Sequence, residues 1–167
     1  MNKTIKLLLF LGIISGLSGI AIGSLNTVLE PIIEENDRKV LLENINEIFP
    51  DSDFETLDYS NSTVKSVYKI AGKGYICETT ATGYNNNTAI DILIGFDEDG
   101  TIVALKTLTQ QETNGYGSKC FEEANIEKNY LNKKIDEDVD MVSGATLTSN
   151  AMKKMIDAAR DAIKELD

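Results

Sequence analysis

The chain has 167 residues, of which 42% are hydrophobic and 26% are charged, a composition typical of a folded protein and not of a disordered one. Its 16 basic and 27 acidic residues give a net charge of −11, and such an acidic protein is a poor partner for nucleic acid because the phosphate backbone repels it. The chain contains no histidine, which excludes Ser-His-Asp and Cys-His catalysis and every histidine-ligated metal site.

The N-terminal region predicts a membrane anchor. No charged residue lies between Lys6 and Glu30, and this run is long enough to cross a bilayer as a helix. Because Lys3 and Lys6 precede the run, the positive-inside rule predicts a cytoplasmic segment at 1–6, a transmembrane helix at 7–29 and an extracytoplasmic domain at 30–167. A cleaved signal peptide is the alternative, although its apolar core would be shorter.

Four glycines of this anchor fall on one helix face. They recur at intervals of four, three and four residues, which places them on a single stripe. Such a stripe lets another transmembrane helix approach closely. The sequence therefore predicts other integral membrane proteins as partners, packed against Gly12, Gly16, Gly19 and Gly23.

The remaining chain predicts an α+β domain, with a small, mostly antiparallel sheet and flanking helices. Pro31 can open an amphipathic helix that ends before Pro50. Runs rich in β-branched and aromatic residues predict strands. Asp97 to Gly100 forms a hairpin connection and lacks the ligand spacing of a calcium loop. The predicted strands cover 64–70, 74–82, 89–96 and 101–108.

The C-terminal part is predicted to be a loop, an acidic mixed stretch and a helix. The loop covers 109–118 and the acidic stretch continues to Val139. From Asn150 to Leu166 the apolar residues follow helical spacing, with Thr148 or Ser149 as the N-cap. Cys77 and Cys120 are far apart in sequence; they either pair as an extracytoplasmic disulfide or remain two isolated thiols, one of them buried in a strand.

Directly before that helix stands the segment Asp140-Met141-Val142-Ser143-Gly144-Ala145-Thr146-Leu147-Thr148. Small hydroxyl residues and a glycine leading into a helix N-terminus can bind phosphate, because the first amides have no helical partner and the helix dipole favours an anion. On these grounds alone the segment is equally a capping loop, as at most helix starts.

The segment resembles the flavinylation motif of the FMN-binding domain family. That family includes one component of the Rnf ion-translocating ferredoxin:NAD oxidoreductase (RnfG) and one of the sodium-pumping NADH:quinone oxidoreductase (NqrC). The resemblance implies FMN held by a phosphodiester bond to the threonine that closes Ser-Gly-Ala-Thr, which is Thr146 here. Asp140 then either bonds the threonine hydroxyl during transfer or favours the helix N-terminus electrostatically.

A second stretch carries the same resemblance. Phe96 to Ile102 is similar to the family's hairpin, and Gln111 to Gly117 is similar to a family loop that packs against the flavin ring. Asn114 replaces the usual proline and Tyr116 the usual leucine, so a tyrosine is placed to stack on the ring. The cofactor-binding residues expected from both stretches are Thr146, Ser143, Gly144, Ala145, Thr148, Glu112, Thr113, Tyr116 and Gly117.

The resemblance implies an electron-transfer subunit of an Rnf-type complex in the cell membrane, not catalytic by itself. It also implies maturation by a separate magnesium-dependent flavin transferase with FAD as donor. Two alternatives remain open. One is a stand-alone anchored FMN domain for extracellular electron transfer, and the other is a flavin-free structural or sensor module, in which the Ser-Gly-Ala-Thr segment only starts a helix.

Overall fold

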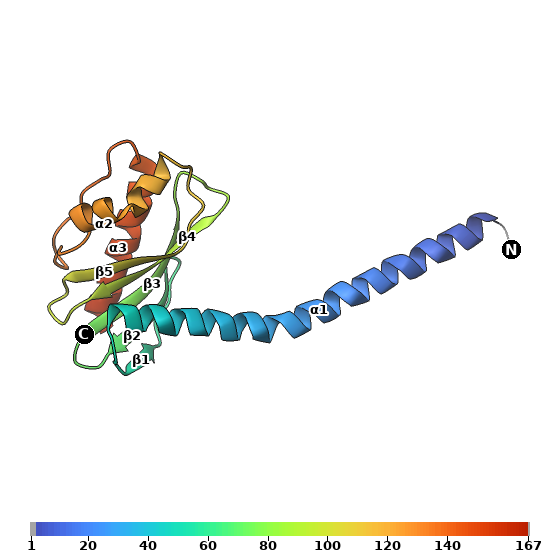
Figure 1. Ribbon diagram of the computed structural model, residues 1–167, viewed down its shortest axis with the longest axis horizontal. Coiled ribbons are helices and arrows are strands. Elements are labelled where there is room, and N and C mark those ends of the chain that lie inside the picture. The colour runs from blue at the N-terminus through green and yellow to red at the C-terminus, as the bar shows by residue number, and fades with distance from the viewer. Residues whose placement is uncertain (1–2, 167) are drawn as a thin grey trace. The chain divides into compact units, whose positions relative to one another are not determined.

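A computed structural model describes residues 3–166 of the chain. They divide into two compact units, with residues up to Asn44 in the first and residues from Ile45 in the second. The first unit is helical, and the second contains a five-stranded sheet and a long C-terminal helix (Figure 1). The predicted α+β class, with an N-terminal apolar helix followed by an antiparallel sheet, is therefore confirmed.

Helix α1 covers Lys3–Ile48 and contains Pro31 in its interior. The expectation that a separate helix opens at Pro31 is wrong. Proline fixes φ close to the helical value, so it can stand inside a helix at the loss of one backbone hydrogen bond. The part before Glu30 is long and apolar enough to cross a membrane, while the limits of the span at 7 and 29 stay a prediction.

The sheet is an antiparallel meander in which each strand pairs with the next one along the chain. Three predicted strands have the predicted bounds, and the last begins and ends one residue later than expected. The first strand was not predicted, because it is short and half exposed at the edge of the sheet. The strands are β1 Phe54–Leu57, β2 Val64–Ile70, β3 Gly74–Thr82, β4 Ala89–Phe96 and β5 Ile102–Thr109.

The turn between β4 and β5 is the predicted hairpin connection. Asp97 Oδ1 accepts hydrogen bonds from the N–H groups of Asp99 at 3.0 Å and Thr101 at 2.8 Å. Gly100 has a φ of +72°, a conformation that glycine adopts without a steric penalty. The aspartates therefore shape a turn.

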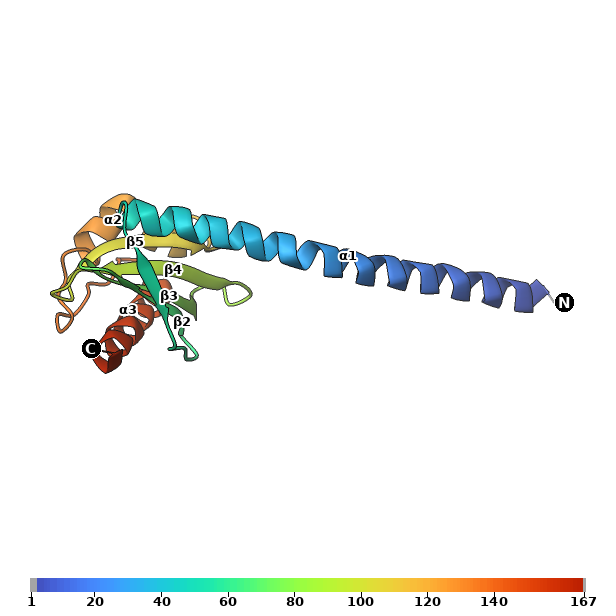
Figure 2. The same ribbon diagram turned by 90° about the horizontal axis from the view of Figure 1, so that it is seen from below.

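Helix α3, Thr146–Leu166, lies across β2 and β3 on one face of the sheet (Figure 2). Its apolar stripe, which includes Met152, Ile156 and Ala159, packs on strand residues such as Cys77 and Ile92, and all are fully buried. Burying each large apolar side chain stabilises the fold by about 1.5–3 kcal/mol. This helix is therefore part of the core of the second unit.

Helix α3 begins four residues earlier than predicted, so the assignment of Thr148 or Ser149 as its N-cap is wrong. Both residues lie inside the helix and are buried. Their hydroxyl groups are hydrogen-bonded to other parts of the site, and the sequence pattern does not distinguish that use from capping.

The stretch between β5 and α3 also holds structure that was not predicted. A 3-10 helix, η1, covers Gly117–Phe121, and a short helix, α2, covers Glu123–Asn129. Cys120 lies in η1 and Cys77 in β3; both are buried and both are free thiols. The disulfide alternative is therefore wrong, and the alternative of two isolated thiols is confirmed.

Candidate functional site

The segment before α3 presents Thr146 at the start of the helix. Gly144 has a φ of +78°, and the N–H of Ala145 bonds the carbonyl of Val142 at 3.1 Å, which closes a turn. The Ser149 N–H then bonds the carbonyl of Ala145 at 2.8 Å, the first bond of the helix. Ala145 therefore occupies the N-cap position, and the exposed Thr146 side chain stands where unpaired amides and the helix dipole favour an anion.

A pocket of about 240 Å³ adjoins Thr146. Three stretches that are distant in sequence form it: the turn after β3, the loop before η1, and the first turn of α3 with the glycine before it. Its lining combines aromatic side chains with backbone that carries small residues. The lining residues are Tyr84, Tyr116, Gly117, Gly144, Ala145, Thr146, Leu147 and Thr148.

Large apolar side chains are exposed around this pocket. Leu147 and Tyr116 are 58% and 59% exposed, and Tyr84 is 54% exposed. Among the described residues from Ile45 onward, these three are the most exposed large hydrophobic side chains. The rings of Tyr84 and Tyr116 lie 6.2 Å apart and within 14° of parallel. Exposed apolar surface gathered at one place marks a site that a ligand or partner covers.

Glu112 joins the stretches that form the pocket. Its carboxylate, in a residue only 9% exposed, accepts a 2.6 Å hydrogen bond from Thr148 Oγ1. It also accepts bonds from the backbone N–H groups of Tyr84 and Asn85, each at 3.1 Å. Three donors satisfy this buried acceptor, and Glu112 thereby holds the Tyr84 turn against the start of α3.

Gly117 makes room for this carboxylate. A Cβ at that position would stand 1.8 Å from Glu112 Oε2 and 2.5 Å from Thr148 Oγ1. Only a residue without a side chain allows the backbone of the loop to pass so close to the pair. The glycine therefore sets the depth of the pocket floor.

A second buried contact holds the loop from the core side. Ser149 Oγ accepts a 3.0 Å hydrogen bond from the N–H of Val142 and lies 3.4 Å from Cys120 Sγ. Burial is the main cause that raises the pKa of the Cys120 thiol. A thiol that stays protonated is a weak nucleophile, so Cys120 packs the loop and is not activated.

The structure brings most of the expected residues together. Six of them line the pocket, and Glu112 lies beneath it. Ser143 and Thr113 do not line it. Thr113 acts through its backbone, whose carbonyl accepts bonds from the N–H groups of Tyr116 at 3.1 Å and Ser118 at 3.4 Å. The six lining residues are Tyr116, Gly117, Gly144, Ala145, Thr146 and Thr148.

Asp140 takes part in a separate contact. Its carboxylate is 67% exposed and pairs with Lys133 at 3.2 Å. This hydrogen bond is the largest cause that raises the pKa of Lys133. Asp140 therefore ties down the chain that leads into the motif.

The sequence reasoning missed three residues at the site. Leu147 was overlooked between two threonines of the motif. Tyr84 lies 62 positions before Thr146, and no local pattern connects the two. Lys119 places its Nζ 3.6 Å from the position that a Cβ on Gly144 would take; its place only two residues after Gly117 was the available signal.

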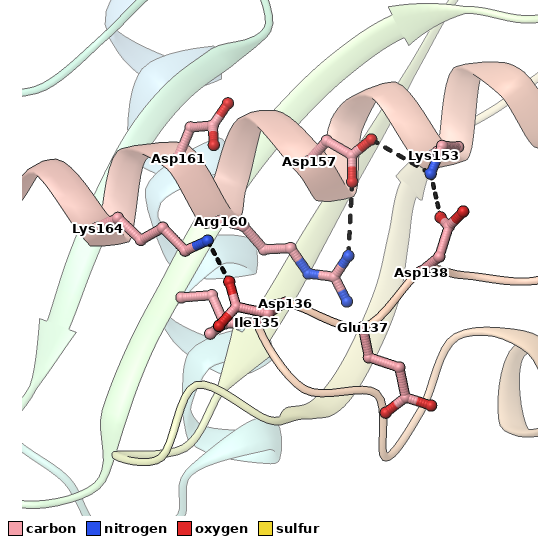
Figure 3. Close-up of a pocket in the computed structure, with 9 residues that line it drawn as sticks. All are labelled: Ile135, Asp136, Glu137, Asp138, Lys153, Asp157, Arg160, Asp161 and Lys164. Atoms are coloured by element: carbon pink, nitrogen blue, oxygen red, sulfur yellow. Dashed lines mark hydrogen bonds and ion pairs between the residues drawn. The ribbon is translucent and has the colours of Figure 1, made fainter.

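A larger pocket, shown in Figure 3, lies along the second half of α3. Its charges are already paired: Lys164 bonds Asp136 at 2.6 Å, Lys153 pairs with Asp138 and Asp157, and Arg160 Nη1 lies 3.5 Å from Asp157. Five carboxylates outnumber three cations around it. This pocket therefore disfavours a phosphate and instead ties the 135–138 loop to the helix.

Comparison with known proteins assigns the region that contains the Thr146 pocket. Residues 83–161 match the family model described as "FMN-binding domain". This region belongs to the FMN-binding domain family. The resemblance inferred from the two motifs is thereby confirmed, and the domain extends from the Tyr84 turn through most of α3.

A named relative of the FMN-binding domain agrees. Over 83 residues the chain is 34% identical to a Cereibacter sphaeroides protein, the RnfG component of an ion-translocating oxidoreductase complex. The match covers 48% of this chain and 38% of that relative. The chain therefore matches well under two thirds of the relative's length. Together the two matches support an FMN-binding electron-transfer protein.

Proposed function

We propose that the FMN-binding domain carries FMN covalently, through a phosphodiester bond to Thr146 Oγ1, and that the protein transfers electrons with it. One observation carries the proposal. The three most exposed large apolar side chains among the described residues of the second unit gather at a single pocket, and that pocket adjoins an exposed threonine at a helix N-terminus.

The residues present fit the cofactor. Bound FMN supplies electron-transfer chemistry that the amino acids of this chain lack. Thr146 and the first turn of α3 would hold the phosphate, because unpaired amides and the helix dipole favour its charge. Tyr84, Tyr116 and Leu147 would cover the faces of the ring and exclude water from it.

Attachment requires a partner enzyme. Thr146 Oγ1 would attack the flavin-side phosphorus of FAD, forming the new P–O bond as the bond between the two phosphates breaks. AMP leaves with the electron pair of that bond. The chain has no histidine to accept the hydroxyl proton, so the base comes from the magnesium-dependent flavin transferase that we propose as the maturation partner.

The proposed setting is an Rnf-type ion-translocating complex in the cell membrane, which the named relative supports. In this setting residues 7–29 span the membrane, 1–6 are cytoplasmic and the FMN-binding domain within 30–167 is extracytoplasmic. Other integral membrane subunits would pack on the glycine face of α1. A Cβ at Gly12, Gly16, Gly19 or Gly23 would meet no atom within 4 Å, so that face is open to them.

Flavin fluorescence on a denaturing gel tests the proposal. The full chain is expressed with a flavin transferase, beside Thr146→Ala and Ser143→Ala. We expect a fluorescent band in the wild-type protein and in Ser143→Ala, and none in Thr146→Ala. Ser143 is a matched control because it is an exposed hydroxyl of the same loop outside the pocket. A fluorescent Thr146→Ala band, or a dark wild-type band with an active transferase, would contradict the proposal.

A further inference from the structure

Lys119 is held beside the attachment segment by contacts from both sides. Its N–H bonds the carbonyl of Tyr116 at 3.2 Å, and its own carbonyl accepts a 2.9 Å hydrogen bond from Asn125 Nδ2. The backbone of this residue is therefore fixed in η1. The side chain extends toward Gly144, where its ammonium lies 3.6 Å from the place of a missing Cβ.

The ammonium of Lys119 has no carboxylate partner in the described structure. Among residues 3–166, no ion pair of Lys119 lies within 4 Å, whereas Lys133, Lys153 and Lys164 each pair with at least one aspartate. Acidic residues outnumber basic ones by 27 to 16 in this chain. A half-buried lysine that avoids all of these acids leaves its charge available at the pocket.

We propose that Lys119 is the cation that pairs with the phosphodiester on Thr146. The inference rests on the proposed function and adds to it a positioning residue for the phosphate. Gly144 lies two positions before Thr146 and lines the same pocket. Because its φ of +78° excludes most side chains, no side chain at that position separates the ammonium from the phosphate.

The pairing has a physical basis in the charge balance of the site. The phosphodiester adds one negative charge to an acidic protein. The partial positive charge at the N-terminus of α3 offsets some of it, and the ammonium of Lys119 supplies a full opposite charge on the side of Gly144. The same ammonium attracts the phosphates of the flavin donor before transfer, so Lys119 acts on loading as well as on the finished cofactor.

The rate of flavin loading is the first measurement. Full-length wild-type protein, Lys119→Gln, Lys119→Arg and the control Lys128→Gln are incubated with transferase and FAD, and the fluorescent band is followed over time. Lys128 is an exposed lysine of α2, so its variant makes the same change of charge. We expect loading to slow by about three- to tenfold in Lys119→Gln, and to stay near the wild-type rate in Lys119→Arg and Lys128→Gln.

Amine labelling separates a phosphate contact from a merely structural role. Wild-type protein is labelled with an acylating reagent before and after flavin loading, and modification of Lys119 and Lys128 is measured by mass spectrometry. We expect loading to reduce modification of Lys119 at least about threefold and to leave Lys128 unchanged.

The outcomes separate the two proposals. Equal loading rates in Lys119→Gln and wild type, or unchanged labelling of Lys119 after loading, overturns this inference while covalent FMN on Thr146 stands. A wild-type protein that takes up no flavin overturns the proposed function itself, and the pairing with it.

Discussion

Thr148 Oγ1 and Glu112 Oε2 lie 2.6 Å apart, although 36 residues separate them in the chain. The same carboxylate oxygen accepts the N–H of Tyr84. The start of α3 and the turn after β3 therefore share one acceptor, and the shape of the pocket depends on it.

This arrangement predicts coupled losses of stability. Glu112→Gln replaces one acceptor oxygen by a donor, so at least one bonded N–H or hydroxyl loses its partner, at a cost of about 1–3 kcal/mol in the free energy of unfolding. Thr148→Val removes one donor and costs about 1 kcal/mol. In urea titrations the double variant should lose less than the sum of the single variants. Strict additivity would show that the two side chains act independently.

Gly117→Ala should be more harmful than a glycine substitution in open space. Its Cβ would collide with Glu112 Oε2 at 1.8 Å, so the carboxylate must leave its three donors. Gly72→Ala is the control, because Gly72 has a φ of +65° and no atom within 4 Å of the new Cβ; it bears only backbone strain of about 1–2 kcal/mol. We expect Gly117→Ala to show the larger fall in urea stability and slower flavin loading. An equal effect of the two substitutions would contradict the collision.

The aromatic pair should restrict the flavin ring. A flavin attached only through its phosphate rotates about several single bonds, whereas stacked aromatic contacts hold it still. Fluorescence anisotropy of the loaded protein should therefore fall in Tyr84→Ala and in Tyr116→Ala, while the amount of covalent flavin is unchanged. Tyr59→Ala, in a partly buried residue outside the pocket, is the control. Wild-type anisotropy in both pocket variants would place the ring elsewhere.

Arg160 should stabilise the fold without serving the flavin. Its side chain is 5% exposed, and Nη2 donates a 2.7 Å hydrogen bond to the carbonyl of Lys134. Arg160→Met leaves that carbonyl without its donor, and we expect the free energy of unfolding to fall by about 1–3 kcal/mol. Lys164→Met breaks a solvent-exposed pair and should cost less than about 1 kcal/mol. Flavin loading that stops in a folded Arg160→Met protein would contradict this assignment.

Cys77 should make the fold sensitive to alkaline pH. Burial raises the pKa of its thiol from 9.0 to about 12. Between these two values the unfolded chain loses the proton and the folded protein keeps it, so the unfolded state binds fewer protons. The free energy of unfolding then falls as pH rises, by about 1.4 kcal/mol per pH unit from this group. Urea titrations from pH 8 upward should show a shallower decline for Cys77→Ala; parallel curves would exclude the thiol as a cause.

Three strands and the attachment motif could be predicted from the sequence because their signals are local. The alternation of apolar residues and the glycines beside them define β2, β3 and β4, and Ser-Gly-Ala-Thr identifies Thr146 by resemblance. The start of α3 was wrong because the hydroxyls of Thr148 and Ser149 suit an N-cap equally well. They bond Glu112 and Val142 instead, and such tertiary contacts have no local pattern.

Tyr84 and Lys119 could not be placed in the site for the same reason. Each reaches the Thr146 segment only once the sheet, η1 and α3 have packed together. Helices η1 and α2 were also missed, because their sequences are short and rich in charge, and an isolated helix of that length is marginal in water. Their contacts with neighbouring elements, α3 with η1 and α2 with η1, support them in the folded domain.

The pocket beside Thr146 is assembled from the turn after β3, the loop before η1 and the first turn of α3, and α3 is the last described element of the chain. A polypeptide whose α3 has not yet docked on the sheet has the threonine but not the pocket. If the transferase reads the assembled pocket and not the bare motif, a chain acquires its flavin only after folding, and the yellow colour of the protein reports that the domain has matured.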